Sequence, residues 1–214
     1  RQIVASLRNF SRLDQAEMKP VNIHEGLDNT LLILQHRFKP NSHYPGIAIE
    51  KEYADLPLVV CYAGQLNQVF MNIISNAVDA LEGALAAEMP LNGDRPLLRT
   101  PGDGEDNALG TMIAPPVLTT PKVVIATEAL DGDRVRIQIR DNGPGISSEV
   151  IAKLFDPFFT TKPVGQGTGL GLSISYQIVV EKHRGQLTCQ SKAGQGTTFC
   201  IEIPVEQPEW SEST

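Results

Sequence analysis

Two hairpin signals in the second half of the sequence limit the fold more than any other feature. Residues 123–128 and 134–140 are strand-like segments, the second with alternating polar and apolar residues, and an Asp-Gly dipeptide between them favours a tight turn. A second pair of strand-like segments, 186–191 and 197–203, flanks a turn that contains two glycines. Such hairpins exclude a strict alternation of strands and helices, which an all-parallel sheet requires.

Helical patterns are interspersed with these hairpins. In three stretches apolar residues recur every three or four positions, which is typical of helices packed on one side. The predicted helices are 25–37, 64–81 and 170–182, and the predicted additional strands are 19–23 and 47–53. Together these elements predict an α/β (α+β) fold, in which helices cover one face of a mixed sheet to form a two-layer sandwich.

Composition excludes several classes of function. The 214 residues carry a net charge of −7, so the chain has no basic field to neutralise a nucleic-acid backbone, and we expect no nucleic-acid partner. The longest apolar run, Leu56 to Ala63, is far shorter than the roughly 20 residues of a membrane-spanning helix. Three cysteines without CxxC spacing indicate neither a disulfide framework nor a zinc site, which favours a cytoplasmic location.

The least regular part of the chain lies between Glu82 and Pro121. Glycine and proline make up 11 of these 40 residues, against 22 of the other 174, and the stretch contains no aromatic residue. Such a segment buries too little apolar surface to offset the entropy lost on ordering. We therefore expect a disordered insertion over about 83–121.

The predicted helix at 64–81 combines an apolar face with a polar face that lacks charge over most of its length. The apolar face consists of Leu66, Val69, Phe70, Ile73, Ala77 and Leu81, and the polar stripe of Gln65, Gln68, Asn72, Asn76 and Asp79. A solvent-exposed helix face usually carries Lys and Glu, whereas no charged residue occurs between Gly64 and Val78. Amide groups suit an enclosed polar site, since their oxygens can bind a hard cation and their NH₂ groups can meet phosphate. An ordinary amphipathic helix remains the alternative.

Asp141 follows a strand pattern that directs its side chain into the core. In the segment 135–141 apolar residues occupy the odd positions, so the carboxylate falls on the buried face. A buried carboxylate is costly unless it is hydrogen-bonded, and an adenine amine is a suitable donor, whereas guanine presents a carbonyl there. The alternative is that the strand ends one residue earlier and that Asp141 begins the turn Asn142-Gly143-Pro144-Gly145.

The run Gly165-Gln166-Gly167-Thr168-Gly169-Leu170-Gly171-Leu172 stands directly before a predicted helix. Glycines let backbone N–H groups approach a ligand, and a helix N-terminus favours anions, so the run predicts phosphate binding. The spacing fits neither the dinucleotide fingerprint nor the P-loop. A flexible linker is the alternative.

Five short motifs, in this order, resemble those of the ATP-binding domain of sensor histidine kinases. They are Asn72-Ile73-Ile74-Ser75-Asn76-Ala77, Asp141-Asn142-Gly143-Pro144-Gly145, Phe155-Asp156-Pro157-Phe158-Phe159-Thr160-Thr161-Lys162, Gly167-Thr168-Gly169-Leu170-Gly171-Leu172 and Gly194-Gln195-Gly196-Thr197-Thr198-Phe199. The resemblance implies the Bergerat fold, a mixed sheet backed by three helices, with ATP bound between a helix and a lid at Phe155 to Gly167. Unlike the family, the chain has the insertion and carries Arg184 where a glycine is common, which puts the end of the third helix in doubt.

The resemblance also implies roles for individual residues. Asn76 would be the Mg²⁺ ligand, Asn72 and Lys162 would act at the phosphates as catalytic residues, and Asp141 would accept the adenine amine, with support from the Thr197 hydroxyl. Gly143 and Gly145 would shape the turn beneath the base. The remaining nucleotide-binding residues would be Asp79, Phe158, Phe159, Thr160, Thr161, Gly165, Gly167, Thr168, Gly169, Leu170, Gly171 and Leu172.

The implied activity is transfer of the ATP γ-phosphoryl group to a histidine on an upstream dimerisation domain, followed by relay to a response regulator receiver domain. The full-length protein would then be a homodimer without a membrane segment in this part. Residues 1–18 show a helical stripe and would be the end of a dimerisation helix, followed by the ATP-binding domain at 19–206 and a tail at 207–214. His24-Glu25 imitates a phosphoacceptor motif, but it follows a strand directly and lacks the downstream proline.

Two other functions stay open at this point. An ATP-hydrolysing clamp of the same fold needs a carboxylate base one turn before the metal-binding asparagine, and Asn72 occupies that position. A nucleotide-sensing module without catalysis would use the same binding residues.

Overall fold

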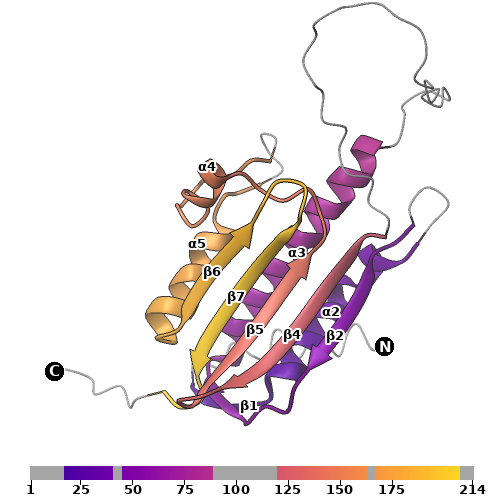
Figure 1. The fold of residues 1–214 in the computed structure, drawn as a ribbon. Coiled ribbons are helices and arrows are strands. Elements are labelled where there is room, and N and C mark those ends of the chain that lie inside the picture. The colour runs from indigo at the N-terminus through magenta and orange to yellow at the C-terminus, as the bar shows by residue number, and fades with distance from the viewer. Residues whose placement is uncertain (1–16, 41–44, 89–119, 163–166, 208–214) are drawn as a thin grey trace, which may run out of the picture.

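The computed structural model describes residues 17–40, 45–88, 120–162 and 167–207. Within them a five-stranded sheet has the order β2-β4-β5-β7-β6, and a separate two-stranded sheet pairs β1 with β3 (Figure 1). The predicted helix at 1–18 lies outside the described residues except for Glu17 and Met18, which are not helical. Most of the predicted insertion and of the C-terminal tail also lies outside them.

The large sheet is mixed, as predicted. Its strands are β2 (Ala48–Tyr53), β4 (Lys122–Leu130), β5 (Arg134–Asp141), β6 (Gln186–Ser191) and β7 (Thr197–Pro204). β2 pairs with β4 in parallel, whereas the β4–β5, β5–β7 and β6–β7 pairs are antiparallel. Both predicted hairpins are therefore confirmed. The turn of the first contains Gly132 and Asp133, both with positive φ.

The small sheet was only half predicted. Strand β1 (Lys19–Val21) lies within the expected strand at 19–23 and pairs antiparallel with β3 (Val59–Cys61), which the sequence analysis did not identify. β3 is three residues long, too short for a recognisable alternation. The Val60 N–H also donates to the carbonyl of Val205, which joins the small sheet to the end of the large one.

Three helical segments cover one face of the large sheet (Figure 1). They are α2 (Ile23–Phe38), α3 (Ala63–Glu88) and α5 (Gly171–Tyr176), which continues as the π-helix η1 (Gln177–Lys182). α2 begins where Asn22 caps it by accepting the His24 N–H at 2.9 Å. The short helix α4 (Ser148–Ile151) lies in the connection between β5 and α5.

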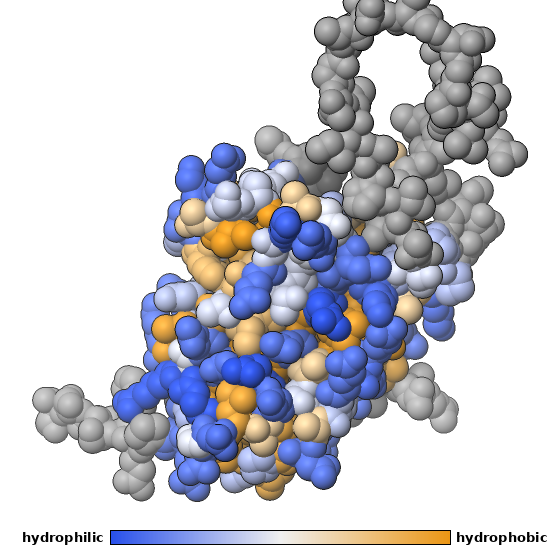
Figure 2. Space-filling model, in the orientation of Figure 1, coloured by the Kyte–Doolittle hydropathy of each residue, from blue (hydrophilic) through white to orange (hydrophobic). Residues whose placement is uncertain are grey.

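The core fills the space between the helices and the sheet. Leu27 and Leu31 of α2, apolar residues of α3 and inward-facing residues of β4, β5 and β7 form one buried cluster. By length and composition α3 is apolar enough to cross a membrane, but most of its large apolar residues belong to this core. The outward-facing side of the sheet carries mainly hydrophilic residues (Figure 2). There Arg136 of β5 forms ion pairs with Glu128 and Glu202 on the two neighbouring strands.

One helix end differs from the prediction, and another confirms it. α3 continues to Glu88, beyond the predicted end at Leu81, so 83–88 is helical instead of part of the insertion. This stretch contains alanines and a leucine, and a single glycine does not stop a helix that is already formed. η1 stops at Lys182, as predicted, and Arg184 takes a left-handed conformation with φ of 49°.

Candidate functional site

The polar stripe of α3 lies opposite a fully buried apolar face, as its spacing predicts. Leu66, Val69, Phe70, Ile73, Ala77 and Leu81 are between 0 and 5% exposed. Within the stripe, Gln68 is exposed, whereas Asn72, Asn76 and Asp79 are half-buried and contact other segments of the chain. The half-buried end of the stripe is therefore the part that can form an enclosed site.

Asp141 ends β5 with its side chain on the core face, and this prediction is confirmed. It pairs with Val123 of β4 and Thr197 of β7, and it is 4% exposed. Its Oδ1 accepts the Gly143 N–H at 2.9 Å, and no lysine or arginine among the described residues forms an ion pair with it. Burial raises the pKa of Asp141 to about 6, although backbone N–H groups of Gly143 and Thr197 oppose the rise.

The turn after Asp141 packs closely against the β6–β7 hairpin. A Cβ on Gly145, whose φ is 68°, would lie 2.2 Å from the Lys192 carbonyl oxygen, so only glycine fits there. The Thr197 hydroxyl contacts Ser191 Oγ at 3.1 Å, and Thr197 reaches Asp141 through its backbone N–H instead of the hydroxyl that the resemblance implied. We call Asp141, Gly143, Gly145 and Thr197 the Asp141 cluster.

Asn72 joins α3 to the start of α5. Its Nδ2 donates to the Gly171 carbonyl at 2.9 Å and to Ser175 Oγ at 3.2 Å. A Cβ on Gly171 would lie 3.4 Å from Asn72 Cγ, so the two helices approach closely at this point. Asn72 thus places the glycine motif beside the polar stripe.

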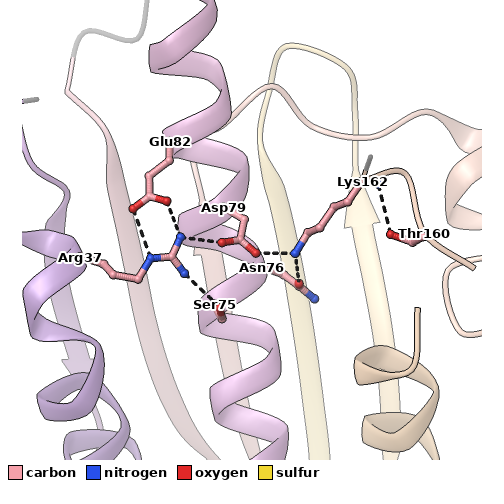
Figure 3. Close-up of polar contacts among 7 residues, drawn as sticks. All are labelled: Arg37, Ser75, Asn76, Asp79, Glu82, Thr160 and Lys162. Atoms are coloured by element: carbon pink, nitrogen blue, oxygen red, sulfur yellow. Dashed lines mark hydrogen bonds and ion pairs between the residues drawn. The ribbon is translucent and has the colours of Figure 1, made fainter. Parts of the chain in front are cut away.

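Asp79 is shared by two cations from different parts of the chain (Figure 3). Its Oδ2 pairs with Nζ of Lys162, and its Oδ1 accepts from Nη2 of Arg37 at 2.5 Å. The Lys162 ammonium also contacts Asn76 Oδ1 at 3.5 Å. Burial alone would raise the pKa of Asp79, but the hydrogen bonds and charges of Lys162 and Arg37 hold this pKa below its ordinary value.

Arg37, which stands in the last turn of α2, is bound to α3 at three positions. Besides Asp79, it contacts both carboxylate oxygens of Glu82, and its Nη1 donates to Ser75 Oγ at 3.1 Å. The sequence analysis did not identify Arg37 or Glu82. We call Arg37, Ser75, Asn76, Asp79, Glu82 and Lys162 the Asp79 cluster (Figure 3).

The segment between α4 and α5 brings the phenylalanine and glycine motifs together. Phe158 is 75% exposed and has φ of 65°, and a Cβ on Gly169 would lie 2.4 Å from the Phe158 carbonyl carbon. A Cβ on Gly167 would lie 2.7 Å from Thr160 Oγ1, which also accepts the Lys162 N–H.

The other predicted residues of these two motifs lie nearby. Thr161 and Thr168 are exposed, whereas Phe159, Leu170 and Leu172 are half-buried. Leu170 precedes the first turn of α5 as its cap residue, and Leu172 packs against the core. Gly165 lies outside the described residues.

Two histidines that could attract a catalytic interpretation have structural contacts. His24 stacks on Tyr53, with ring centroids 4.3 Å apart, and its Nε2 lies 3.0 Å from Thr127 Oγ1. His183 is fully buried, and its Nε2 accepts the Tyr62 N–H at 3.1 Å, so Nδ1 carries the proton and donates to the Ile178 carbonyl. Burial lowers the pKa of His183, which keeps the ring neutral.

Comparison with known proteins identifies this arrangement. Residues 62–207 match the family described as histidine kinase-, DNA gyrase B- and HSP90-like ATPases. The sensory histidine kinase/phosphatase NtrB of Rhizobium leguminosarum bv. phaseoli is 32% identical over 206 residues, which are 96% of this chain and 46% of that protein. The chain thus spans less than half the length of this relative.

Two solved structures share the fold. The nucleotide-free catalytic domain of the histidine kinase ThkA superposes with a TM-score of 0.62 and 26% identity, covering 88% of this chain and 96% of that one. Full-length ShkA in complex with AMPPNP superposes with a TM-score of 0.62 and 25% identity, covering 96% of this chain and 36% of that one. The chain therefore belongs to the family of histidine kinase-, DNA gyrase B- and HSP90-like ATPases, as an ATP-binding catalytic domain of the histidine kinase type.

Proposed function

We propose that this domain binds Mg·ATP between α3, the end of β5 and the 155–172 segment, and donates the γ-phosphoryl group to a histidine on an upstream dimerisation domain. A response regulator receiver domain would then accept the phosphoryl group. The full-length protein would be a homodimer whose catalytic domain works in the cytoplasm. The observation that carries the nucleotide part of the proposal is the buried Asp141 carboxylate, which backbone N–H groups hold and no described cation neutralises.

The Asp141 cluster suits an adenine base. A buried carboxylate that lacks a cation keeps the capacity to accept a neutral N–H donor, and the adenine amine is such a donor. Guanine would place its carbonyl oxygen beside the carboxylate, and the two acceptors would repel each other. The glycine motif and Asn72, which approach one another at the start of α5, lie on the side where the phosphates would follow.

The Asp79 cluster suits the phosphates and a magnesium ion. Asn76 Oδ1 already accepts from an ammonium group, so it can face a cation, and Mg²⁺ is usually bound by few protein oxygens together with substrate phosphates. When bound, Mg²⁺ would supply positive charge that offsets the negative charge of the phosphates during transfer. Asn76 would hold the ion, and Lys162 would bind the phosphates once released from Asp79.

The phosphoacceptor is expected outside the described residues. His183 has both ring nitrogens hydrogen-bonded within the fold. His24 stacks on Tyr53 and contacts Thr127 through Nε2. Asn72, which stands where a hydrolytic clamp would need a carboxylate base, donates its amide to α5 and cannot accept a proton. These contacts favour transfer to an external imidazole over hydrolysis.

Incubation with γ-labelled ATP tests the proposal. The full-length protein should acquire an acid-labile label, and the chain 1–214 alone should acquire none. Asp141→Asn in the full-length protein should reduce labelling at limiting ATP, and unlabelled ATP should compete better than GTP. Acid-labile label on the chain alone that His24→Gln abolishes would show that the acceptor lies within this domain.

A further inference from the structure

The Lys162 ammonium occupies a position defined by two oxygens of α3. Asn76 Oδ1 and Asp79 Oδ2 both face it, because residues three apart lie on one side of a helix (Figure 3). Lys162 itself belongs to the segment that follows α4, far along the chain. A positive charge from one segment thus fills a two-oxygen site on another.

The other carboxylate oxygen of Asp79, Oδ1, is bound by a different cation. Arg37 binds Asp79 Oδ1 and is held in turn by Ser75 and Glu82, so Asp79 stays oriented by α2 whether or not Lys162 is present. The side chain of Arg37 is 20% exposed, whereas that of Lys162 is 37% exposed. Of the two cations, Lys162 is the one that can leave at lower cost, because it makes fewer contacts and is better solvated in its place.

We propose that Asn76 Oδ1 and Asp79 Oδ2 form an exchangeable cation site, which Lys162 fills in the nucleotide-free domain and Mg²⁺ fills when Mg·ATP binds. The inference rests on the proposed function and adds Asp79 to the groups that face the magnesium ion. Arg37 is then the positioning residue that keeps the Asp79 carboxylate directed at the site. Lys162, displaced from Asp79, binds the phosphates that arrive with the ion.

The exchange avoids placing two cations at one carboxylate oxygen, and the arriving phosphates offset the additional positive charge of Mg²⁺. In the nucleotide-free domain the Asp79 carboxylate has two cationic partners. Asn76 is uncharged and contributes only its amide oxygen as an acceptor. Entry of Mg²⁺ without departure of Lys162 would place two cations against one carboxylate oxygen. Entry of ATP phosphates gives the displaced ammonium a new anionic partner, so ion and nucleotide should bind in a coupled manner.

The experiment measures binding of a fluorescent ATP analogue to the chain as free Mg²⁺ is varied. Lys162→Met removes both the competing cation and a phosphate contact, so it should weaken binding of the analogue. At an analogue concentration that saturates each variant, the Mg²⁺ concentration at half-maximal binding should nevertheless fall about two- to fivefold, because nothing then competes with the ion. Asp79→Asn should raise this midpoint by a similar factor. In the double variant the Lys162 substitution should cause no further fall, because its competition acts through Asp79.

Glu50→Gln is the matched control. Glu50 pairs with Lys122 outside the Asp79 cluster, so this variant removes one carboxylate charge from the domain and should keep the parent midpoint. Thermal melting of each variant checks the fold, and Lys162→Met changes a partly exposed side chain, so it can be measured even if Asp79→Asn unfolds the domain.

The outcomes separate this inference from the proposed function. The proposed function itself would be contradicted if the parent chain bound no nucleotide, or if its nucleotide binding did not depend on magnesium. Normal magnesium-dependent binding with a midpoint that Lys162→Met leaves unchanged or raises would overturn the exchange. A midpoint that shifts equally in the single Lys162 variant and on the Asp79→Asn background would remove Asp79 from the site.

Discussion

Two carboxylates of the site, Asp141 and Asp79, are stabilised in opposite ways. Backbone N–H groups hold the buried Asp141, and burial raises its pKa to about 6. Burial acts on Asp79 as well, but two cations more than compensate, and its pKa is lowered. A carboxylate without a cation can take a new donor directly, whereas a paired one can take a ligand only by exchange. The comparison predicts that Asp141 binds the base without rearrangement, whereas Asp79 binds a new cation only when a present one leaves.

The largest effect is expected from a change that breaks the backbone support of Asp141. Gly145→Ala would place a Cβ 2.2 Å from the Lys192 carbonyl oxygen at a positive φ, so it should destabilise the domain by more than about 3 kcal/mol. Gly132→Ala is the control, because its φ is also positive but no atom lies within 4 Å of the added Cβ. It should cost about 1 kcal/mol. Urea denaturation measures both, and equal losses would show that the close packing at Gly145 is unimportant.

The next effect tests recognition without changing the backbone. Asp141→Asn removes a charge-assisted hydrogen bond to the base, which is worth about 1.5 to 3 kcal/mol, or roughly ten- to a hundredfold in ATP affinity. The melting temperature near neutral pH should not fall, because an ionised carboxylate is unfavourable at this buried position. Calorimetry with ATP and GTP checks the assignment, and equal affinity for the two nucleotides in the parent would contradict it.

A pH titration sharpens the contrast between the two carboxylates. Asp141 has a raised pKa in the folded state, so its contribution to stability is present below its ordinary pKa and is lost as the pH rises through about 6. ATP needs the ionised form, so affinity should fall about tenfold between pH 7 and pH 5. Asp141→Asn, which corrects for titration of the phosphates, should lack this part of the decrease. Identical pH profiles for parent and variant would exclude Asp141 as the titrating group.

The smallest effect concerns the ion pairs of the Asp79 cluster. Arg37→Met should destabilise the domain by about 1 kcal/mol, since partly exposed ion pairs contribute little even when several converge. The loss should shrink in high salt, because screening already weakens the parent interaction. Lys51→Met, which removes an ion pair with Asp28 between more exposed side chains, should change stability by less than about 0.5 kcal/mol. A salt-independent loss at Arg37 would assign its role to packing.

The same contrast explains which features the sequence could predict. The direction of the Asp141 side chain follows from the period of its own strand, and the turn glycines follow within four residues, so local pattern was sufficient. The Asp79 cluster joins α2, α3 and the segment after α4. Nothing local to Arg37 indicates that it lies beside Asp79, 42 positions further along the chain. The pairing depends on how two helices pack, which their separate periodicities do not specify.

Other differences have similar causes. Strand β3 has three residues, too few for a recognisable alternation. The apolar run around it was used only to exclude a membrane-spanning helix. The end of α3 was placed too early because its last turns follow a glycine. The Thr197 hydroxyl was assigned to Asp141 by resemblance, whereas the register of β5 and β7 brings the Thr197 backbone there.

His183 shows how strictly hydrogen bonding can specify a residue that takes no part in chemistry. Its position requires a flat side chain that donates at one end, to Ile178 of η1, and accepts at the other, from the N–H that precedes α3. Asparagine and glutamine have a donor and an acceptor, but on one short head group instead of on opposite sides of a ring, and lysine and arginine offer only donors. A second proton would remove the acceptor altogether. The identity of this histidine is set by one lone pair, so its presence in such a chain is no sign of a phosphorylated or catalytic imidazole.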